Sequence, residues 1–556
     1  MAILIANIGT SDLAVKLQGF EYYIPVGFDR NEPNENPEEL TEDENIIWER
    51  NSREDFIASD LCSELDVNVE PKSNGRLSYS FRELTEKLLA AYRQDPESWQ
   101  VRIRLGRIWG VIHTAIEEFS VTKINIFVTD QTRPHHQDTC FLFEIMKMWS
   151  QRHLQREDIL FLKRLIPKDI QLNQQDPLLN EYYRFFVDNV NPNEEVLVSI
   201  KGGTPQMQTA LRLQSITANL PKLLFLDPVL STRKVLLGEP SPCTRTSFWQ
   251  YQRTQNYRVV KLLLERWDFS GAIQVLKNWR SILTFQIVHK ALKKEQVRST
   301  KASLEVVING LTLADALLNL DLDLARSLND DQLPSIDLSQ SHSTLLNLYT
   351  QCRLYQDIDQ IAHFLSRLSS CCEEILDILA EKLGGKKYIG NRGIVYIDKL
   401  KSDLINGQSN FVGDLDYSRQ NDQYKIFSRK SKRAFVEILI EIRQNLGSAS
   451  SQEISSWREC ANYLDKLEYW IWKRNDLIHD GRGFSKQRIQ ELNEGRDQNA
   501  CDYNEIIKVM SSILCSPLLQ LPRQERQRFI EGDDYYLYTD IRQWIIDKLN
   551  DDMKMN

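Results

Sequence analysis

A buried strand that turns through two glycines into a helix is the first candidate site of the chain. Four of the five residues 196–200 are apolar, as expected of a parallel strand covered on both faces. The residues that follow them are Lys201, Gly202, Gly203, Thr204, Pro205, Gln206 and Met207. Glycines let a ligand approach the backbone, Thr204 can cap the helix, and Pro205 fits its first position. Free N–H groups and the helix dipole then favour an anion such as phosphate, although a plain strand-to-helix turn has the same pattern.

Small polar residues also follow two other predicted strands. Residues 3–7 run into Gly9, Thr10, Ser11 and Asp12, and residues 123–128 run into Thr129, Asp130 and Gln131. Backbone N–H groups and small hydroxyls at such positions can reach phosphate or ribose oxygens without crowding. Each group alone is typical of an ordinary helix cap, but the carboxyl ends of parallel strands gather at one edge of a sheet. We therefore expect the three loops to form one ligand site.

Residue types suited to RNA cleavage lie near the end of a long helical segment. Arg474, Asn475 and His479 precede two glycines that end this segment. Asn475 and His479 share a helix face at i and i+4, and Arg474 lies about 140° from His479 at ~3.6 residues per turn. Histidine transfers protons near neutral pH and arginine stabilises charge on a phosphate, so the set suits a metal-independent ribonuclease. Arg107 and His113 match the same loose pattern, which we interpret as accidental.

Neither the histidine pair nor the cysteines predict a metal centre. His135 and His136 follow the second loop without a third ligand at a recognised spacing. We favour a polar loop in which Asp138 or Thr139 caps the next helix. The nine cysteines are scattered without a C-x-x-C pair, which predicts reduced thiols rather than a zinc site or a disulfide framework.

The elements that must position these residues alternate between strands and helices up to about residue 239. The predicted strands are 3–7, 123–128, 159–162, 196–200 and 222–226, and the predicted helices are 99–119, 137–151, 178–190 and 205–218. This alternation predicts an α/β domain with a largely parallel sheet over residues 1–240. Long amphipathic segments follow at 257–267, 346–383, 431–445 and 453–478. Residues 241–556 are therefore predicted to be mostly helical.

The net charge of −9 is concentrated in one window of the chain. Residues 28–70 hold 15 acidic and 3 basic side chains, and the rest of the chain is slightly positive. The prolines, asparagines and glutamates of this window predict a solvated, partly disordered insertion. No apolar run reaches the ~18 residues of a membrane helix, and the first residues lack the basic flank of a signal peptide. We therefore expect a cytoplasmic protein with several hydrophobic cores.

Taken together, these motifs resemble those of the CARF–HEPN ribonucleases that accompany type III CRISPR systems. The matching strings, in order along the chain, are 9–12, 129–131 with 138–139, 202–207, 267–272, and Arg474-Asn475 with His479. The G-G-T-P-Q-M string at 202–207 is similar to the distinctive turn of a CARF domain and is the most specific of them. Arg474, Asn475 and His479 fit the R-N-x-x-x-H form of the HEPN motif.

The resemblance implies a Rossmann-like CARF sensor at 1–240 and a helical linker with a HEPN ribonuclease domain at 241–556. A cyclic oligoadenylate would bind the sensor and switch on cleavage of single-stranded RNA in antiviral defence, without a metal or another cofactor. The RNA's own 2′-OH would attack, leaving a 2′,3′-cyclic phosphate. His479 would transfer protons, Arg474 would stabilise the phosphate, and Asn475 would orient the helix end or the scissile group. One such set per chain implies a homodimer.

The resemblance also implies which residues contact the cyclic oligoadenylate. They are Gly9, Thr10, Ser11, Asp12, Thr129, Asp130, Gln131, Lys201, Gly202, Gly203, Thr204, Gln206 and Met207. Lys201 stands where many family members have a small hydroxyl residue, and the acidic insertion has no counterpart that we can assign. Two alternatives stay open: a ring nuclease that cuts its own messenger through Thr10, Ser11 or Thr204, and a non-catalytic sensor whose helical half binds a partner.

Overall fold

The computed structural model describes residues 2–27, 40–71, 77–229, 231–328, 342–390, 393–404, 409–418, 423–479 and 485–555. The chain divides into two compact units, which are described separately. The first unit comprises Met1–Arg258 and Val275–Lys301, and the second comprises Val259–Gln274 and Ala302–Met555. The predicted domain boundary after residue 240 stays a prediction.

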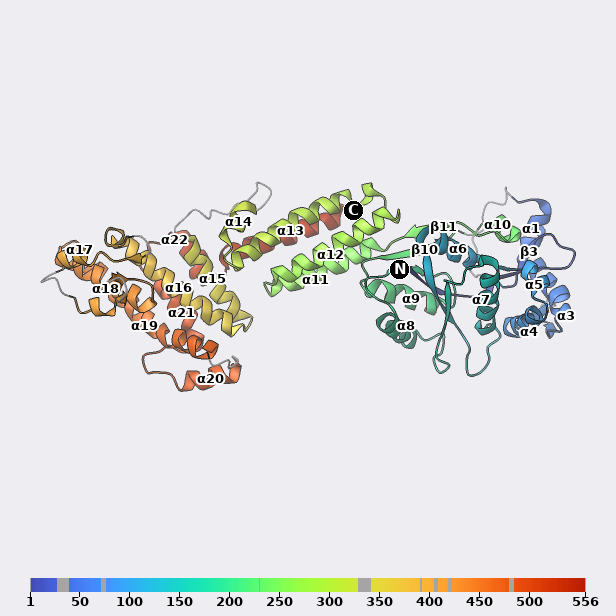
Figure 1. The fold of residues 1–556 in the computed structure, drawn as a ribbon, viewed down its shortest axis with the longest axis horizontal. Coiled ribbons are helices and arrows are strands. Elements are labelled where there is room, and N and C mark those ends of the chain that lie inside the picture. Colours follow the sequence, from blue (N-terminus) through green and yellow to red (C-terminus); the bar gives the residue numbers. More distant parts are fainter. Residues whose placement is uncertain are drawn as a thin grey trace. The chain divides into compact units, whose positions relative to one another are not determined.

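A six-stranded sheet forms the centre of the first unit (Figure 1). Its strands, in spatial order, are β11 (Cys243–Thr246), β10 (Leu223–Pro228), β9 (Glu195–Ser199), β1 (Ala2–Asn7), β7 (Val121–Val128) and β8 (Leu160–Leu165). All neighbours pair in parallel except β11, which is antiparallel to β10. Each of the five predicted strands is present. The α/β prediction with a largely parallel sheet is therefore confirmed.

Helices cover both faces of this sheet. They are α6 (Arg107–Phe119) and α7 (Cys140–Leu154) on one face, and α8 (Gln175–Asn189) and α9 (Pro205–Thr217) on the other. On β1, Leu4 belongs to the apolar cluster beneath α6 and α7, whereas Ile3 and Ile5 belong to the cluster beneath α8 and α9. Figure 1 shows α7 and α8 on opposite sides of the sheet. This burial on both faces explains why β1 and β9 have almost continuous apolar sequences.

The predicted helix at 99–119 is wrong at its centre. It consists of α5 (Pro96–Arg102), a short strand β6 (Ile103–Leu105), and α6 after Gly106. β6 pairs with β2 (Leu13–Lys16), which also pairs with β3 (Tyr23–Pro25). A Cβ atom on Gly106 would lie 2.3 Å from the carbonyl oxygen of Ser11. The helix is interrupted because two backbones meet at this glycine.

The acidic window is folded where the structure describes it, so the prediction of a partly disordered insertion is wrong for residues 42–64. This segment forms α1 (Glu42–Trp48), α2 (Arg50–Phe56), the π-helical turn Ile57–Leu61 and α3 (Cys62–Glu64). Ile47, Ile57 and Leu61 lie in the same apolar cluster as Leu4. A hairpin of β4 (Val69–Pro71) and β5 (Leu77–Tyr79) follows, and then α4 (Phe81–Gln94). Buried apolar residues at helical spacing stabilise the segment despite its acidic composition.

Helices make up most of the remaining chain, as predicted. They are α10 (Thr232–Leu237), α11 (Trp249–Glu265), α12 (Phe269–Val288), α13 (Arg298–Leu318), α14 (Leu322–Leu328), α15 (Ser343–Asp357), α16 (Ile361–Lys382), α17 (Ile397–Ser402), α18 (Arg429–Asn445), α19 (Ser451–His479), α20 (Lys486–Glu494), α21 (Ile506–Leu514), α22 (Arg523–Glu525) and α23 (Tyr536–Met555). A hairpin of β12 (Asp416–Ser418) and β13 (Gln423–Lys425) lies among them. The segment predicted at 346–383 is two helices, because Asp359 adopts φ +58° between them. Within the described ranges, no helix is long and apolar enough to cross a bilayer.

Gly202→Ala tests the closest backbone approach in the sheet. A Cβ atom at Gly202 would lie 2.1 Å from the carbonyl oxygen of Asn7, so β1 and β9 must shift apart. We expect the free energy of unfolding of this region to fall by roughly 1–3 kcal/mol, as is typical of overpacking. Hydrogen exchange of peptides from β1 and β9 measures it. Gly413→Ala is the control, because no atom lies within 4 Å of its Cβ position, and it should leave these peptides unchanged.

Candidate functional site

The three predicted loops lie at one edge of the sheet. Ala6 on β1 pairs with both Ile126 on β7 and Ser199 on β9, so the three strands end at the same level. A Cβ atom on Gly9 would lie 3.3 Å from the backbone nitrogen of Gly203, so the first and third loops are in contact. The expectation that the three loops converge is confirmed.

The loop after β1 is a 3-10 turn (Thr10–Asp12) held by the Asp12 carboxylate. The backbone N–H groups of Gly9 and Ile108 donate to this carboxylate at 2.8 and 3.1 Å, and Arg107 Nε lies 3.7 Å from it. Asp12 is only 1% exposed. Although it was predicted to contact ligand, its carboxylate is instead used inside the protein. Thr10 and Ser11 are partly exposed and stay predicted contacts.

The glycine turn after β9 is shaped to begin a helix. Gly203 has φ +78°, a conformation that glycine adopts without strain. Thr204 Oγ1 accepts a hydrogen bond from Met207 N–H at 3.2 Å, which caps α9, and donates to Leu172 O at 3.2 Å. The Met207 side chain is fully buried, and its Sδ and Cε atoms are the nearest neighbours of the Cβ position of Gly203, so this side chain packs against the turn from the core. Lys201 is exposed beside the turn.

The loop after β7 is closed by its own polar side chains. Thr129 and Thr139 exchange hydrogen bonds between backbone N–H and hydroxyl groups at 3.1 and 3.2 Å. The buried carboxylate of Asp138 accepts from the backbone N–H groups of Gln131 and His135 at 3.2 and 3.0 Å. Thr139 occupies the cap position of α7 without a cap hydrogen bond from its side chain. The expected polar loop is present, but Asp138 and Thr139 close the loop rather than cap the helix.

The two histidines of this loop pack against each other, with ring centroids 4.2 Å apart. Burial, and then the neighbouring His135, lower the pKa of His136. The described part of the chain contains no group of three or more His, Cys, Asp or Glu side chains arranged to hold a metal ion.

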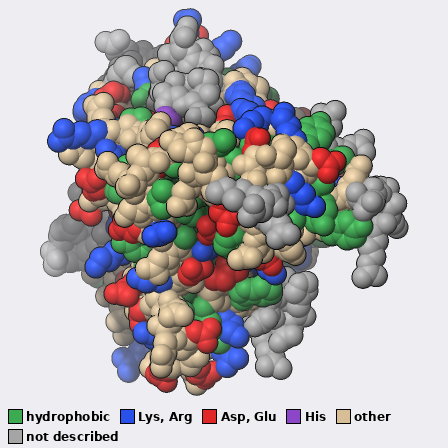
Figure 2. Space-filling view, turned by 90° about the vertical axis from the view of Figure 1, so that its left-hand side faces the viewer, with side chains coloured by type: hydrophobic (Ala, Val, Ile, Leu, Met, Phe, Trp, Pro, Cys, Tyr) green, Lys and Arg blue, Asp and Glu red, His purple; other side chains and the backbone are tan. Residues whose placement is uncertain are grey.

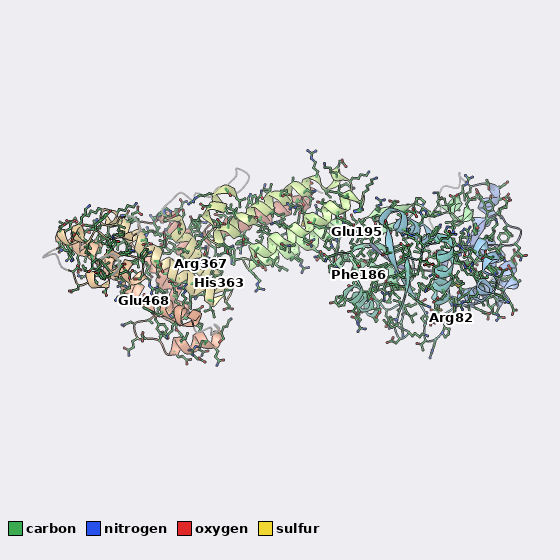
Figure 3. The ribbon with its side chains drawn as sticks, in the orientation of Figure 1. Arg82, Phe186, Glu195, His363, Arg367 and Glu468 are labelled. Atoms are coloured by element: carbon green, nitrogen blue, oxygen red, sulfur yellow. The ribbon has the colours of Figure 1, made fainter. Side chains whose placement is uncertain are left out.

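Two cations at this edge were not predicted from the sequence. Arg82 Nη1, on α4, lies 2.7 Å from Asp130 and 3.0 Å from Asp138 (Figure 3). Lys168 Nζ, in the connection between β8 and α8, lies 2.9 Å from the other oxygen of Asp130. Partial burial raises the pKa of Asp130, but hydrogen bonds from Lys168 and Arg82 outweigh it, so the pKa is lowered. Neither cation belongs to a recognisable sequence motif, and each is brought next to Asp130 by tertiary structure.

The candidate nuclease residues belong to α19 in the helical unit. This helix is anchored by Trp470, which is fully buried and donates to Cys501 O at 2.9 Å. Arg429 of α18 holds Glu468 through two hydrogen bonds of 2.6 and 3.2 Å. Arg474 is partly buried one helical turn further along. The side chains of Asn475 and His479 lie outside the described residues, so the arrangement of the predicted catalytic set stays a prediction.

A cavity of about 460 Å³ lies beside α19. Its lining includes the ion pairs of Arg429 with Glu468 and of Arg433 with Asp465, together with Trp472. Trp472 is 58% exposed, two residues before Arg474. On the face drawn in Figure 2, acidic and basic side chains are interspersed rather than gathered by sign. The cavity combines an exposed aromatic ring with paired charges.

No family model and no curated protein matches this chain. Among solved structures it is similar to Enterococcus italicus Csm6 bound to cyclic hexa-2′-fluoro-hexa-dAMP, with 14% sequence identity and a TM-score of 0.44. The match covers 80% of this chain and 95% of that chain.

Asp12→Ala tests whether this carboxylate supports the loop. Removing it leaves the partly buried N–H group of Gly9 and the buried N–H group of Ile108 without this acceptor. We expect the free energy of unfolding to fall by about 2 kcal/mol or more, since each buried donor without an acceptor costs ~1–3 kcal/mol. Hydrogen exchange of peptides covering residues 8–15 measures the change. Ser11→Ala, next to it and partly exposed, should have little effect; equal stability of the two variants would contradict a structural role of Asp12.

Proposed function

We propose that this chain is a ribonuclease of the CARF–HEPN type, switched on by a cyclic oligoadenylate that binds at the edge formed by β9, β1 and β7. The observation that carries the proposal is the contact between Gly9 and Gly203 beside the G-G-T-P-Q-M turn. It brings backbone N–H groups from two strand ends together at the start of α9. Such groups bind phosphate oxygens, and the helix dipole strengthens the interaction.

The proposed ligand fits the chemistry available at this edge. Asp12 and Asp138 are used internally, so the groups left for a ligand are backbone N–H groups, the hydroxyls of Thr10 and Ser11, and Lys201. These groups donate hydrogen bonds or carry positive charge. They therefore suit an anionic ligand with ribose hydroxyls, as a cyclic oligoadenylate has.

The proposed chemistry is assigned to α19. His479 transfers a proton as the RNA's 2′-OH attacks the adjacent phosphate, and the products are a 2′,3′-cyclic phosphate and a 5′-OH. Arg474 stabilises the charge that develops on the phosphate, and Asn475 orients the helix end or the scissile group. The exposed ring of Trp472 offers a stacking surface for an unpaired RNA base next to this set. The reaction in this scheme uses no metal.

A homodimer is part of the proposal. One Arg474 and His479 set per chain makes a shared site across a two-fold axis the simplest arrangement, and a symmetric dimer also matches a cyclic, symmetric ligand. The mass of the protein in solution tests the homodimer separately from the chemistry.

The structure disfavours one of the three hydroxyl groups that the sequence suggested for the ring-nuclease alternative. The Thr204 hydroxyl already accepts from Met207 N–H and donates to Leu172 O. Attack on a bound messenger would thus depend on Thr10 or Ser11. Incubating Arg474→Ala protein with each cyclic oligoadenylate tests this alternative, and we expect the rings to remain intact. Linear products would show that the sensor cuts its own ligand.

His479→Ala tests the proposed ribonuclease in the full chain. Single-stranded RNA is incubated with the protein and with cyclic tri-, tetra- or hexa-adenylate. We expect one ring size to activate wild-type cleavage, and His479→Ala to lower the rate roughly 10²–10⁴-fold, as for the loss of a general acid or base. His363→Ala is the matched control, because His363 is an exposed histidine on α16 that stacks on Tyr355 (Figure 3); it should retain activity.

Three results of this assay would contradict the proposal. Cleavage by His479→Ala at the wild-type rate would show that His479 does not transfer the proton. Strong inhibition by EDTA would favour a metal nuclease. A wild-type protein that binds a ring but cleaves no RNA would favour the non-catalytic sensor.

A further inference from the structure

The connection between β8 and α8, residues 166–174, spans the candidate ligand edge. At its start, Ile166 N–H donates to Val128 O at 3.0 Å, and Thr132 Oγ1 donates to Lys168 O at 2.9 Å. Near its end, Leu172 O accepts from Thr204 Oγ1 at 3.2 Å. The connection therefore touches the loop after β7 and the turn after β9. Because β1 lies between these strands, the connection passes the end of β1 as well.

Lys168 is an exposed cation on this connection. Its side chain is 53% exposed, and its ammonium group pairs with Asp130, which is 21% exposed. Ion pairs this exposed contribute roughly 0–1 kcal/mol, so little free energy is lost when such a pair opens. The backbone hydrogen bonds of residues 166, 168 and 172 hold the connection without this pair.

Arg82 is fixed more firmly than Lys168. It contacts Asp130 at 2.7 Å and the fully buried Asp138 at 3.0 Å. When Asp130 turns away, Arg82 keeps its contact with Asp138. Asp130 is thus a partly exposed carboxylate between two cations. It lies at the end of β7, which is separated from β9 and its glycine turn by β1 alone.

We propose that, in the ligand-free protein, the Asp130 carboxylate occupies the position beside Lys168 that a phosphodiester of the ligand takes on binding. The phosphodiester then replaces Asp130 as the partner of Lys168. This inference rests on the proposed function, because it assigns a phosphate contact within the same ligand site. Lys168 then turns from Asp130 to the phosphate, and Arg82 remains on Asp138. Asp130, expected from the sequence to contact ligand, acts as its competitor. The phosphodiester carries the same charge as the carboxylate that it replaces beside Lys168, and charge-assisted hydrogen bonds to phosphate are strong.

The opposite effects of Lys168→Ala and Asp130→Asn test this inference. Binding of cyclic tri-, tetra- and hexa-adenylate to the full-length protein is measured by calorimetry, and the ring that binds wild type is used for the variants. Lys168→Ala should weaken binding about tenfold, which corresponds to about 1.4 kcal/mol. Asp130→Asn should strengthen binding roughly two- to fivefold, since it removes a competitor whose exposed pair is worth up to ~1 kcal/mol.

Lys123→Ala is the matched control. Lys123 is also an exposed lysine of the same sheet, but it lies near the start of β7, at the opposite edge. Its removal makes the same change in net charge and should leave binding unchanged. Thermal melting of each variant checks that the fold is retained.

The outcomes separate this inference from the proposed function. The inference is overturned if wild type binds a ring and Lys168→Ala binds it with the same affinity, or if Asp130→Asn binds it more weakly than wild type. Either result leaves the proposed function standing. Equal losses in Lys168→Ala and Lys123→Ala would show a non-specific charge effect and would also overturn it. If wild type binds none of the three rings, the proposed function and this inference fail together.

Discussion

The backbone contact between the ends of β1 and β9 is the constraint on which the rest of the site depends. Gly202 lies against the carbonyl oxygen of Asn7, and Gly9 lies against the backbone nitrogen of Gly203. A side chain at either contact would separate the two strand ends. This close approach brings the free N–H groups at the start of α9 next to those of the first loop. The candidate ligand site is therefore made primarily by backbone, and the surrounding side chains support it.

Those supporting side chains divide into two groups. Buried carboxylates fix the loops: Asp12 holds the turn after β1, and Asp138 closes the loop after β7. Exposed or half-exposed cations, Lys168 and Lys201, remain at the surface where a ligand arrives. Because the carboxylates of Asp12 and Asp138 are used inside the protein, the exposed lysines can attract an anion to this edge although the whole chain is acidic. The location of charge decides this preference, and the net charge does not.

Much of the fold could be predicted from local sequence, and much of the site could not. β1 and β9 were predictable because burial on both faces produces continuous apolar runs. β6 was missed because it is only three residues long and lies between two helical segments, and pairing with the distant β2 makes it a strand. The folded part of the acidic window was missed because charge conceals a few buried apolar residues. Arg82 and Lys168 reach Asp130 through tertiary contacts, which leave no motif.

The central claim is that the edge formed by β9, β1 and β7 receives a cyclic oligoadenylate. Hydrogen exchange of the full-length protein, with and without the ring that activates it, tests this claim most directly. Gly9, Thr129 and Gln131 already donate their backbone N–H groups within the protein. The account therefore predicts slower exchange for the backbone N–H groups of residues 10–11, 130 and 201–204, since a bound phosphate accepts hydrogen bonds from these loops. Unchanged exchange at all three loops, with protection elsewhere in the chain, would contradict it.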